Sequence, residues 1–544
     1  MNSFSKISPP AFLPVGAHVT GDGVRYRVWA PERAQVLVAI GGKRKPLRSV
    51  ELVRGADGCF TGHDPAGGEG DLYRFVFDDG TLVPDIASRF QPLGVFGPSQ
   101  VVDPGRYRWQ TPDWRRPPFR GRVIYELHVG TFTRRGTFRA LIEHLDHLAG
   151  LGVNTIELMP VADFPGRWNW GYDGVMLFAP ARCYGKPDDL RVLVDAAHAR
   201  GLAVVLDVVY NHLGPEGNHL PQYSERYFHP ERTSPWGPTF NFDGDGSRQV
   251  RNFFIQNALY WLDEFKIDGL RLDATHAVKD DSAIHFFAEV AAAVHSRGAF
   301  TIAEDERNQV AVLTEQEAGG WGVDAVWADD FHHTVRVALT GEQESYLGSY
   351  VGTPDEWIET LAHGWLYRGQ FYAHWKKARG TDSAHLSPER FVFCLSNHDQ
   401  VGNRPLGERL HAVVSPEAYR AVSVLLCLSP YTPMLFMGQE WGATTPFFYF
   451  TDQPGDLGEK ISASRIGEFE RQGLRLRPDT IGRVPDPQAE DTFKNSKLKW
   501  SESSEGSHAA LTMLYRGMFT TARAGTSFSE SAARPMDGKK SRGR

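Results

Sequence analysis

One unit recurs along this chain between residues 122 and 437: an apolar run rich in β-branched residues, a polar loop, and an amphipathic helical stretch. The runs predicted to be strands are 122–129, 153–159, 202–209, 267–272, 299–303, 323–327, 390–395 and 432–436. Helices are predicted between them, including 137–150, 188–200 and 248–265. Strands that alternate with helices form a parallel sheet, and eight such units close into a (β/α)8 barrel. The predicted fold class is therefore α/β, with a TIM barrel as the main domain.

Acidic residues stand where four of these predicted strands run into their loops. They are Asp207, Asp273, Glu304 and Asp399. Any one of them alone would be read as a surface or capping carboxylate. Together they belong to three distinctive patterns, Asp-x-x-x-Asn-His from 207, Arg-x-Asp from 271 and Asn-His-Asp from 397. Because the active site of a TIM barrel lies at the carboxyl ends of its strands, we expect these acids to meet there.

This combination of acids indicates chemistry on sugars. Retaining cleavage of a glycoside needs a carboxylate nucleophile and a carboxylic acid roughly 5 Å apart, with an oxocarbenium-like transition state between them. Carboxylates delivered by neighbouring strands of a barrel can meet that requirement. The sequence therefore predicts a retaining glycosidase.

Several stretches of the chain resemble the α-amylase superfamily of glycoside hydrolases, over roughly residues 122–441. Within it they are most similar to the malto-oligosyltrehalose trehalohydrolases, on these segments: YELHVGTFT (125–133), WGYDGV (170–175), DATHA (273–277), AEDERN (303–308), NHDQVGNRPLGERL (397–410) and FMGQEW (436–441). Glycogen branching and debranching enzymes share the barrel, the DG-x-R-x-D run and an A-E-D triplet. They are not expected to carry the segment at 397–410.

The resemblance implies roles for the three acids. Asp273 matches the nucleophile, Glu304 the general acid and later general base, and Asp399 the third acid that grips sugar hydroxyls. Arg271 lies two residues before Asp273, so both side chains share one face of a strand and the guanidinium keeps the carboxylate ionised. The apolar residues before Glu304 predict a raised pKa for its carboxyl group.

Five further residues are expected to bind substrate or to position the acids. His212 and His398 match histidines that hydrogen-bond the glucose in the −1 subsite, and Tyr172 matches an aromatic platform under that ring. Asp207 is expected to orient Arg271. The alternatives are a core aromatic for Tyr172 and loop-packing polar residues for the histidines. Tryptophans that either line the cleft or pack the core are Trp168, Trp170, Trp236, Trp327 and Trp441.

The implied substrate is malto-oligosyltrehalose, a malto-oligosaccharide whose reducing end is a trehalose unit. Water would cleave the α-1,4 bond next to that unit and release trehalose. The implied functional partner is malto-oligosyltrehalose synthase, which makes the substrate. Two alternatives remain: an α-glucan branching or debranching enzyme, and a glycan-binding protein without turnover.

Composition excludes other classes of function. The formal net charge is −7, without a long Lys/Arg cluster in the globular part, which argues against a nucleic-acid partner. The four cysteines are scattered without metal spacing, which favours reduced thiols in the cytoplasm.

No secretory signal stands out at the N-terminus. The apolar stretch 421–437 is broken by Pro430 and Pro433, so no membrane span is expected. We expect no metal and no other cofactor.

The remaining segments suggest the domain plan. Residues 1–110 predict a small β-sandwich of the immunoglobulin-like, early-set type, because strand-like pieces lie at 23–40 and 73–77. Its packing against the barrel is favoured over glycan binding. The barrel should span 111–455, and 456–516 should hold its end and the start of a C-terminal segment. The family's C-terminal β-domain is expected to be truncated here, and the Ser-, Arg- and Gly-rich residues 517–544 predict a disordered tail.

Overall fold

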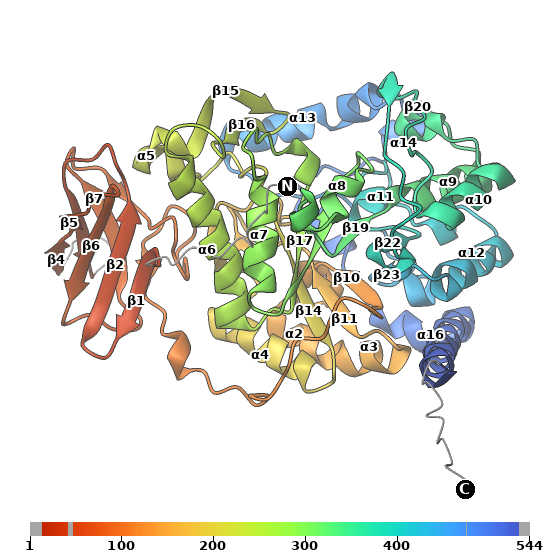
Figure 1. Cartoon of the computed structure of the whole chain (residues 1–544), viewed down its shortest axis with the longest axis horizontal. Helices are drawn as coiled ribbons and strands as arrows, with labels where there is room; N and C mark the ends of the chain where they lie inside the picture. The colour runs from red at the N-terminus through yellow and green to blue at the C-terminus, as the bar shows by residue number, and fades with distance from the viewer. Residues whose placement is uncertain (1–13, 42–46, 475, 533–544) are drawn as a thin grey trace, which may run out of the picture.

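The computed structural model describes residues 14–41, 47–474 and 476–532. A closed barrel of parallel strands forms the centre of the molecule, and a pair of antiparallel sheets lies to one side of it (Figure 1). The barrel strands, in their order around the barrel, are β10 (Ile124–Leu127), β11 (Thr155–Leu158), β14 (Ala203–Val208), β17 (Gly269–Leu272), β18 (Phe300–Glu304), β19 (Ala325–Trp327), β22 (Phe391–Cys394) and β23 (Thr432–Phe436). The last strand pairs with the first and closes the barrel. Eight predicted strands and the predicted barrel are confirmed.

Helices follow the strands and cover the outside of the barrel. The predicted helices at 188–200 and 248–265 are α4 (Pro187–His198) and α6 (Ser247–Phe265). The predicted helix at 137–150 is divided into α2 (Phe138–Leu141), the 3-10 turn η2 (Ile142–His144) and α3 (Leu145–Leu151). Further outer helices are α7 (Phe286–His295), α9 (Asp329–Thr340), α10 (Pro354–His363) and α12 (Pro416–Leu428).

The interior of the barrel has an apolar layer and a polar layer. Alternate residues of a strand point to the same side, so inward-facing residues two positions apart on one strand reach different depths of the barrel. The apolar layer is a cluster separate from the main core and includes Ile124, Val205, Phe300, Ile302, Val392 and Met434, with Phe119 beside them. Two residues further along the strands stand Glu126, Asp207 and Glu304. The polar layer therefore forms at the carboxyl end of the barrel.

The N-terminal sheets pack face to face. One contains β1 (Gly16–Thr20), β2 (Gly23–Trp29), β6 (Cys59–Asp64) and β5 (Val53–Arg54). The other contains β4 (Arg48–Glu51), β3 (Val36–Ile40), β7 (Leu72–Phe77) and β8 (Leu82–Val83), with β9 (Ser99–Gln100) on β7. The rings of Tyr26 on β2 and Tyr73 on β7 meet edge to face across the two sheets, with centroids 5.1 Å apart. The predicted N-terminal sandwich is confirmed.

The sandwich is attached to the barrel by buried contacts. The hydroxyl of Tyr223, in the short helix α5 (Leu220–Tyr223), donates a hydrogen bond of 2.7 Å to the carbonyl of Pro84. The ring of Trp29 lies edge to face against Tyr227, 5.1 Å between centroids. These contacts support the view that the sandwich packs against the barrel.

The elements described after β23 are all helical. They are the 3-10 segment η9 (Gln439–Trp441), α13 (Gly455–Arg471), α14 (Pro478–Ile481), α15 (Glu490–Asn495), the 3-10 segment η10 (Trp500–Ser504) and α16 (Gly506–Ala532). Residues 517–544 are predicted to form a disordered tail, and the structure instead continues α16 as far as residue 532. Tyr515, Met518 and Phe519 recur at helical spacing and are buried against the barrel domain, which holds the helix in place. Residues 533–544 lie outside the described part.

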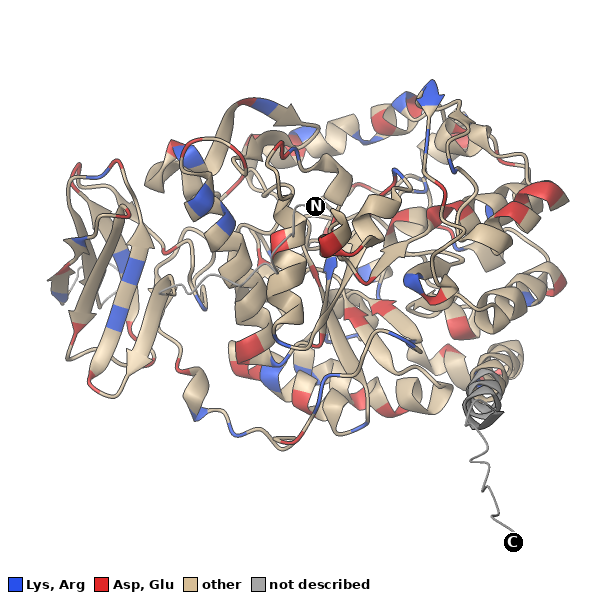
Figure 2. Cartoon of the chain, viewed as in Figure 1, with Lys and Arg blue, Asp and Glu red and all other residues tan. Residues whose placement is uncertain are grey.

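Acidic and basic residues are interspersed over the sandwich and the barrel (Figure 2). Within the described ranges, the helices are either too short or too polar to cross a bilayer. All four cysteines are present as free thiols, and three of them are buried.

Candidate active site

Arg271 occupies the centre of the polar layer and binds three carboxylates. Its Nη1 donates to Asp207 Oδ2 over 2.6 Å and to Asp273 Oδ1 over 2.8 Å, and its Nη2 donates to Glu304 Oε2 over 2.7 Å. The three acids come from the ends of the adjacent parallel strands β14, β17 and β18. One fully buried guanidinium therefore joins three of the four predicted strand-end acids.

Arg271 is fixed from other sides as well. Its guanidinium carbon lies 4.1 Å from the centroid of the Trp327 ring, close enough for a cation–π contact. Asp207 also accepts a 2.6 Å hydrogen bond from the hydroxyl of Tyr172. Burial raises the pKa of Asp207, although the Arg271 charge and the two hydrogen bonds oppose that shift. Asp207 thus links Tyr172 to Arg271.

Asp273 is held by two donors. Besides Arg271, the side-chain amide of Asn211 donates to its Oδ2 over 2.6 Å, and the same amide reaches its backbone carbonyl over 2.9 Å. Burial, followed by the nearby Glu304 and Asp207 charges, raises the pKa of Asp273 against the pull of Arg271. Because three acids share one cation, the cluster favours retaining a proton near neutral pH.

Glu304 has a different environment from the one its sequence neighbours suggest. Burial acts to raise its pKa, but Arg271, His276 and the backbone N–H of Ala274, 2.9 Å from Oε2, outweigh burial and hold the pKa below its usual range. Ala274 presents that N–H from a left-handed conformation with φ of 39°. The prediction of a raised pKa for Glu304 is therefore wrong in this structure, because tertiary donors rather than Ile302 and Ala303 dominate.

His398 lies beside Tyr172 and is bound by a glutamate. Its Nδ1 is 2.5 Å from Oε1 of Glu126, and its backbone N–H donates to the other oxygen of that carboxylate over 3.1 Å. Asp399 and Glu126 together overcome the effect of burial and raise the pKa of His398 to about 9. The ring stacks on Tyr172 with centroids 5.0 Å apart. His398 is thus a buried imidazolium at neutral pH.

His212 contacts the backbone of Tyr172. Its Nε2 is 3.1 Å from the backbone carbonyl of Tyr172, and its ring stacks on Trp236, 4.9 Å between centroids. Burial lowers the pKa of His212 to about 4, so the imidazole is neutral. Trp236, in the turn between β15 (Phe228–Ser234) and β16 (Gly237–Phe240), keeps 49% of its surface exposed. An aromatic face therefore remains available beside the site.

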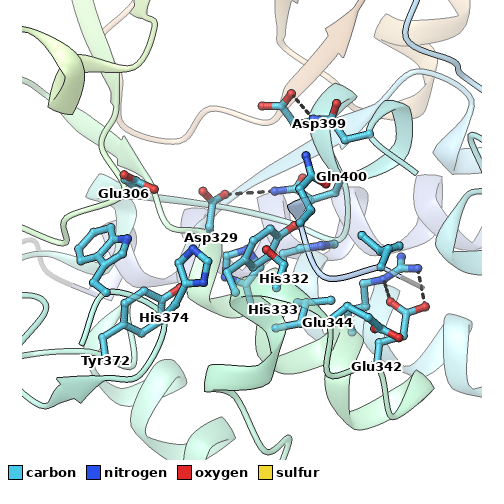
Figure 3. A pocket seen from close by; sticks show the side chains of 18 of the residues that line it. Glu306, Asp329, His332, His333, Glu342, Glu344, Tyr372, His374, Asp399 and Gln400 are labelled. Carbon is cyan, nitrogen blue, oxygen red and sulfur yellow. Dashed lines mark hydrogen bonds and ion pairs between the residues drawn. The ribbon is translucent and has the colours of Figure 1, made fainter. Parts of the chain in front are cut away.

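Asp399 and Glu304 line one cavity of about 380 Å³. Figure 3 shows its wall, in which Asp399, Asp329 and Glu306 face the same space and Gln400 reaches toward Asp329. The Asp399 side chain keeps 41% of its surface exposed and accepts a 3.0 Å hydrogen bond from Asn403. A polar cavity of this kind can hold a sugar next to Glu304.

Comparison with known proteins agrees with this geometry. Residues 103–236 match the family model of the alpha-amylase catalytic domain. The chain is 43% identical over 509 residues to the malto-oligosyltrehalose trehalohydrolase of Deinococcus radiodurans. The alignment covers 92% of this chain and 81% of the Deinococcus protein. The chain belongs to the malto-oligosyltrehalose trehalohydrolase family.

This trehalohydrolase family member is also similar to two other proteins. A solved structure from Salmonella typhimurium, described as an alpha amylase, superposes with a TM-score of 0.87 at 40% identity and covers 94% of this chain and 87% of that one. The 1,4-alpha-glucan branching enzyme of Corynebacterium jeikeium is 30% identical over 477 residues, with 79% of this chain and 62% of that one covered.

The structure brings all the predicted site residues of this family member to one end of the barrel. Asp207, Arg271, Asp273, Glu304 and Tyr172 form one hydrogen-bonded network, and His398, His212 and Asp399 border it. Of the tryptophans, Trp236 and Trp327 contact site residues, and Trp170 lies edge to face with His398. Trp441 is fully buried in the core, and Trp168 stacks on Phe493.

Sequence reasoning missed three groups that hold the acids and His398 in place: Glu126, Asn211 and the N–H of Ala274. Each lies inside a motif that was identified, but its role depends on a partner from another strand. A glutamate in the middle of an apolar strand was the available signal for Glu126. Across the described ranges, His, Cys, Asp and Glu side chains form no group of three or more arranged to hold a metal ion.

Proposed function

We propose that this chain is a retaining glycoside hydrolase that cleaves the α-1,4 bond next to the terminal trehalose unit of malto-oligosyltrehalose and releases trehalose. The observation that carries the proposal is the shared hold of Arg271 on Asp273 and Glu304, at the ends of neighbouring strands, in a chain of the trehalohydrolase family. Two carboxyl groups that reach one guanidinium are suited to the short separation required for retention.

The proposed reaction has two steps. In the first, an oxygen of Asp273 attacks the anomeric carbon, the bond to the leaving trehalose unit breaks, and the proton of Glu304 goes to the leaving oxygen. In the second, Glu304 takes a proton from water, the oxygen of that water bonds to the anomeric carbon, and the ester to Asp273 breaks.

The first step needs the proton on Glu304 and the charge on Asp273. Asp273 has two donors for its charge, Arg271 and Asn211. In the complex, a glycosidic oxygen that approaches Glu304 gives its proton an acceptor. In the free protein the pKa of Asp273 is raised and that of Glu304 is lowered. We infer that the proton of this crowded acidic cluster moves to Glu304 once sugar is bound.

The remaining residues would bind the sugar in the −1 subsite. Tyr172 offers its ring as a platform; His398 stacks on that ring, and His212 contacts the backbone carbonyl of Tyr172. Asp399, partly exposed on the wall of the shared cavity, would accept hydrogen bonds from sugar hydroxyls. Asp207 would hold the side chains of Arg271 and Tyr172 in position and would not contact the reacting carbon.

The setting of the reaction is also proposed. A malto-oligosyltrehalose synthase would supply the substrate, and both proteins would work in the cytoplasm. The four free thiols are compatible with a reducing compartment.

The first test is incubation of the purified chain with maltotriosyltrehalose. The parent chain should release trehalose and maltotriose in equal amounts. Glu304→Gln, which keeps the shape but removes the transferable proton, should lower kcat by about 10²–10⁴-fold because general acid catalysis is lost. Circular dichroism should show the same fold for both proteins. A folded parent chain that leaves the substrate intact would contradict the proposal.

A branching or debranching enzyme is the second candidate, favoured by the 30% identity to a branching enzyme. Incubation with amylose and glycogen would distinguish it, because altered branch content without trehalose release supports this candidate. A glycan-binding protein without turnover is excluded if turnover is measured and is lost in Asp273→Ala while binding persists.

A further inference from the structure

Five buried polar atoms of Arg271 and its neighbours have no hydrogen-bond partner among the described residues. This group comprises both carboxyl oxygens of Glu157, Oδ1 of Asp207, Nε of Arg271 and Nε1 of Trp327. Buried polar groups without partners are uncommon, and each costs stability unless a water molecule or another group satisfies it. Because these atoms are concentrated in one part of the barrel, they are expected to have a common function.

Glu157 enters this group from strand β11. It stands opposite Glu126 on β10 and opposite Val205 on β14, and both neighbours point into the barrel. Its side chain therefore points into the barrel, between Glu126 of the polar layer and Val205 of the apolar layer. Only 1% of the residue is exposed. Both of its carboxyl oxygens are buried, and Arg271 and His398 are its positively charged neighbours.

Its neighbours disfavour a negative charge on Glu157. The titratable groups that face it are Glu126, Asp207, Arg271, His398 and Cys394. Arg271 is already bound to three carboxylates, and His398 is already bound to Glu126. Burial first, and then Glu126 and Asp207, raise the pKa of Glu157 well above its usual range.

We propose that Glu157 is an uncharged positioning residue which, together with ordered water, supports the Asp207–Arg271 pair and the Glu126–His398 pair from inside the barrel. A protonated carboxyl supplies one O–H donor and accepting oxygens. The unpartnered N–H groups of Arg271 and Trp327 are donors, and Asp207 Oδ1 is an acceptor. A buried water needs two to four such polar partners, and this group provides them. Glu157 does not touch the substrate, because both of its carboxyl oxygens are buried.

The kinetic test compares Glu157→Gln with Glu157→Leu, and it rests on the proposed hydrolase function. Glutamine keeps the shape, a donor and an acceptor, so kcat should stay within about threefold of the parent value and the pH profile should not move. Leucine removes the polar partners, so Arg271 loses its support and kcat should fall by about tenfold or more with KM nearly unchanged. Overturning results are a Leu variant with the parent kcat and pH profile, or a Gln variant as impaired as the Leu variant.

A second measurement does not depend on turnover or on the folding of the Leu variant. The infrared spectrum of the parent protein at neutral pH should contain the C=O stretching band of a buried protonated carboxyl, and Glu157→Gln should remove it. A parent spectrum in which this substitution removes only carboxylate bands would overturn the proposal. A parent protein that shows the band but releases no trehalose would refute the proposed function and leave the charge state of Glu157 established.

Discussion

At the scale of single residues, the site is governed by one cation shared among several acids. Arg271 binds Asp207, Asp273 and Glu304, and each of these acids has a second donor from elsewhere: Tyr172, Asn211 or the N–H of Ala274. Removal of any one donor should therefore disturb the balance among the three acids. The size of the effect should depend on how directly that donor contacts an acid.

Tyr172→Phe tests the donor to Asp207. Loss of the hydroxyl leaves a buried carboxylate oxygen with one donor fewer, which costs about 1–3 kcal/mol, so kcat/KM should fall by about fivefold or more. The ring and its stacking on His398 remain. Tyr419→Phe is the matched control, because that hydroxyl donates to the carbonyl of Gln439 away from the site. An unchanged kcat/KM in Tyr172→Phe would show that Asp207 needs no second donor.

His398 predicts a pH dependence of stability. Its pKa is raised from 6.5 to about 9 in the folded protein, so its contribution is complete below about pH 6.5 and is lost as the pH rises through about 9. The shift corresponds to about 3 kcal/mol. Urea unfolding at pH 6.5 and pH 9.5 should show that loss. In His398→Gln the difference between the two pH values should shrink by this amount; an unchanged difference would assign the pH dependence to other groups.

At the scale of elements, helix α16 is the segment that differs most from expectation. Its sequence is rich in Ser, Arg and Gly, yet Tyr515 and Phe519 lie one helical turn apart and pack inward. The Tyr515 hydroxyl donates to Ser423 on α12 over 2.8 Å. At Gly152 an added Cβ would lie only 2.7 Å from that of Phe519, so the helix passes close to the end of α3. Tertiary packing thus stabilises a segment whose composition alone suggests disorder.

Phe519→Ala tests this packing. Truncation of a fully buried phenylalanine should lower the free energy of unfolding by about 3 kcal/mol, as measured by urea denaturation. Met513→Ala, on the exposed side of the same helix, should change it by no more than about 0.5 kcal/mol. Equal effects at the two positions would mean that α16 does not contribute to the core.

At the scale of the whole molecule, the sandwich and the barrel are joined by side chains that belong to the core of both. Trp29 is only 5% exposed and contacts Tyr227 beyond the sandwich. The same interface includes the buried hydrogen bond from Tyr223 to Pro84. We therefore expect the sandwich to stabilise the barrel without contacting the sugar.

Trp29→Ala separates packing from glycan binding. Loss of this buried ring should lower the free energy of unfolding by about 3 kcal/mol. The KM for maltotriosyltrehalose, measured well below the unfolding temperature, should stay within about twofold of the parent value. A large rise in KM with the fold intact would instead assign a binding role to the sandwich.

The sequence alone determined the barrel and the positions of the acids. Strand alternation and the point at which a strand meets its loop are local properties, so Asp207, Asp273, Glu304 and Asp399 could be placed at one end of the barrel from their spacing alone. The same reasoning put Arg271 and Asp273 on one face of β17. The family followed from motifs that lie at those strand ends.

Only the tertiary structure decided how these acids differ from one another and where the chain stays ordered. The pKa of Glu304 depends on Arg271 and Ala274, from the neighbouring strand, and that of His398 depends on Glu126 across the barrel. Glu157 becomes noteworthy only when its neighbours in space are known. Helix α16 is ordered because the barrel domain buries one of its faces. Charge interactions and burial act through space between residues that are far apart in the chain, so they cannot be inferred from local spacing in the sequence.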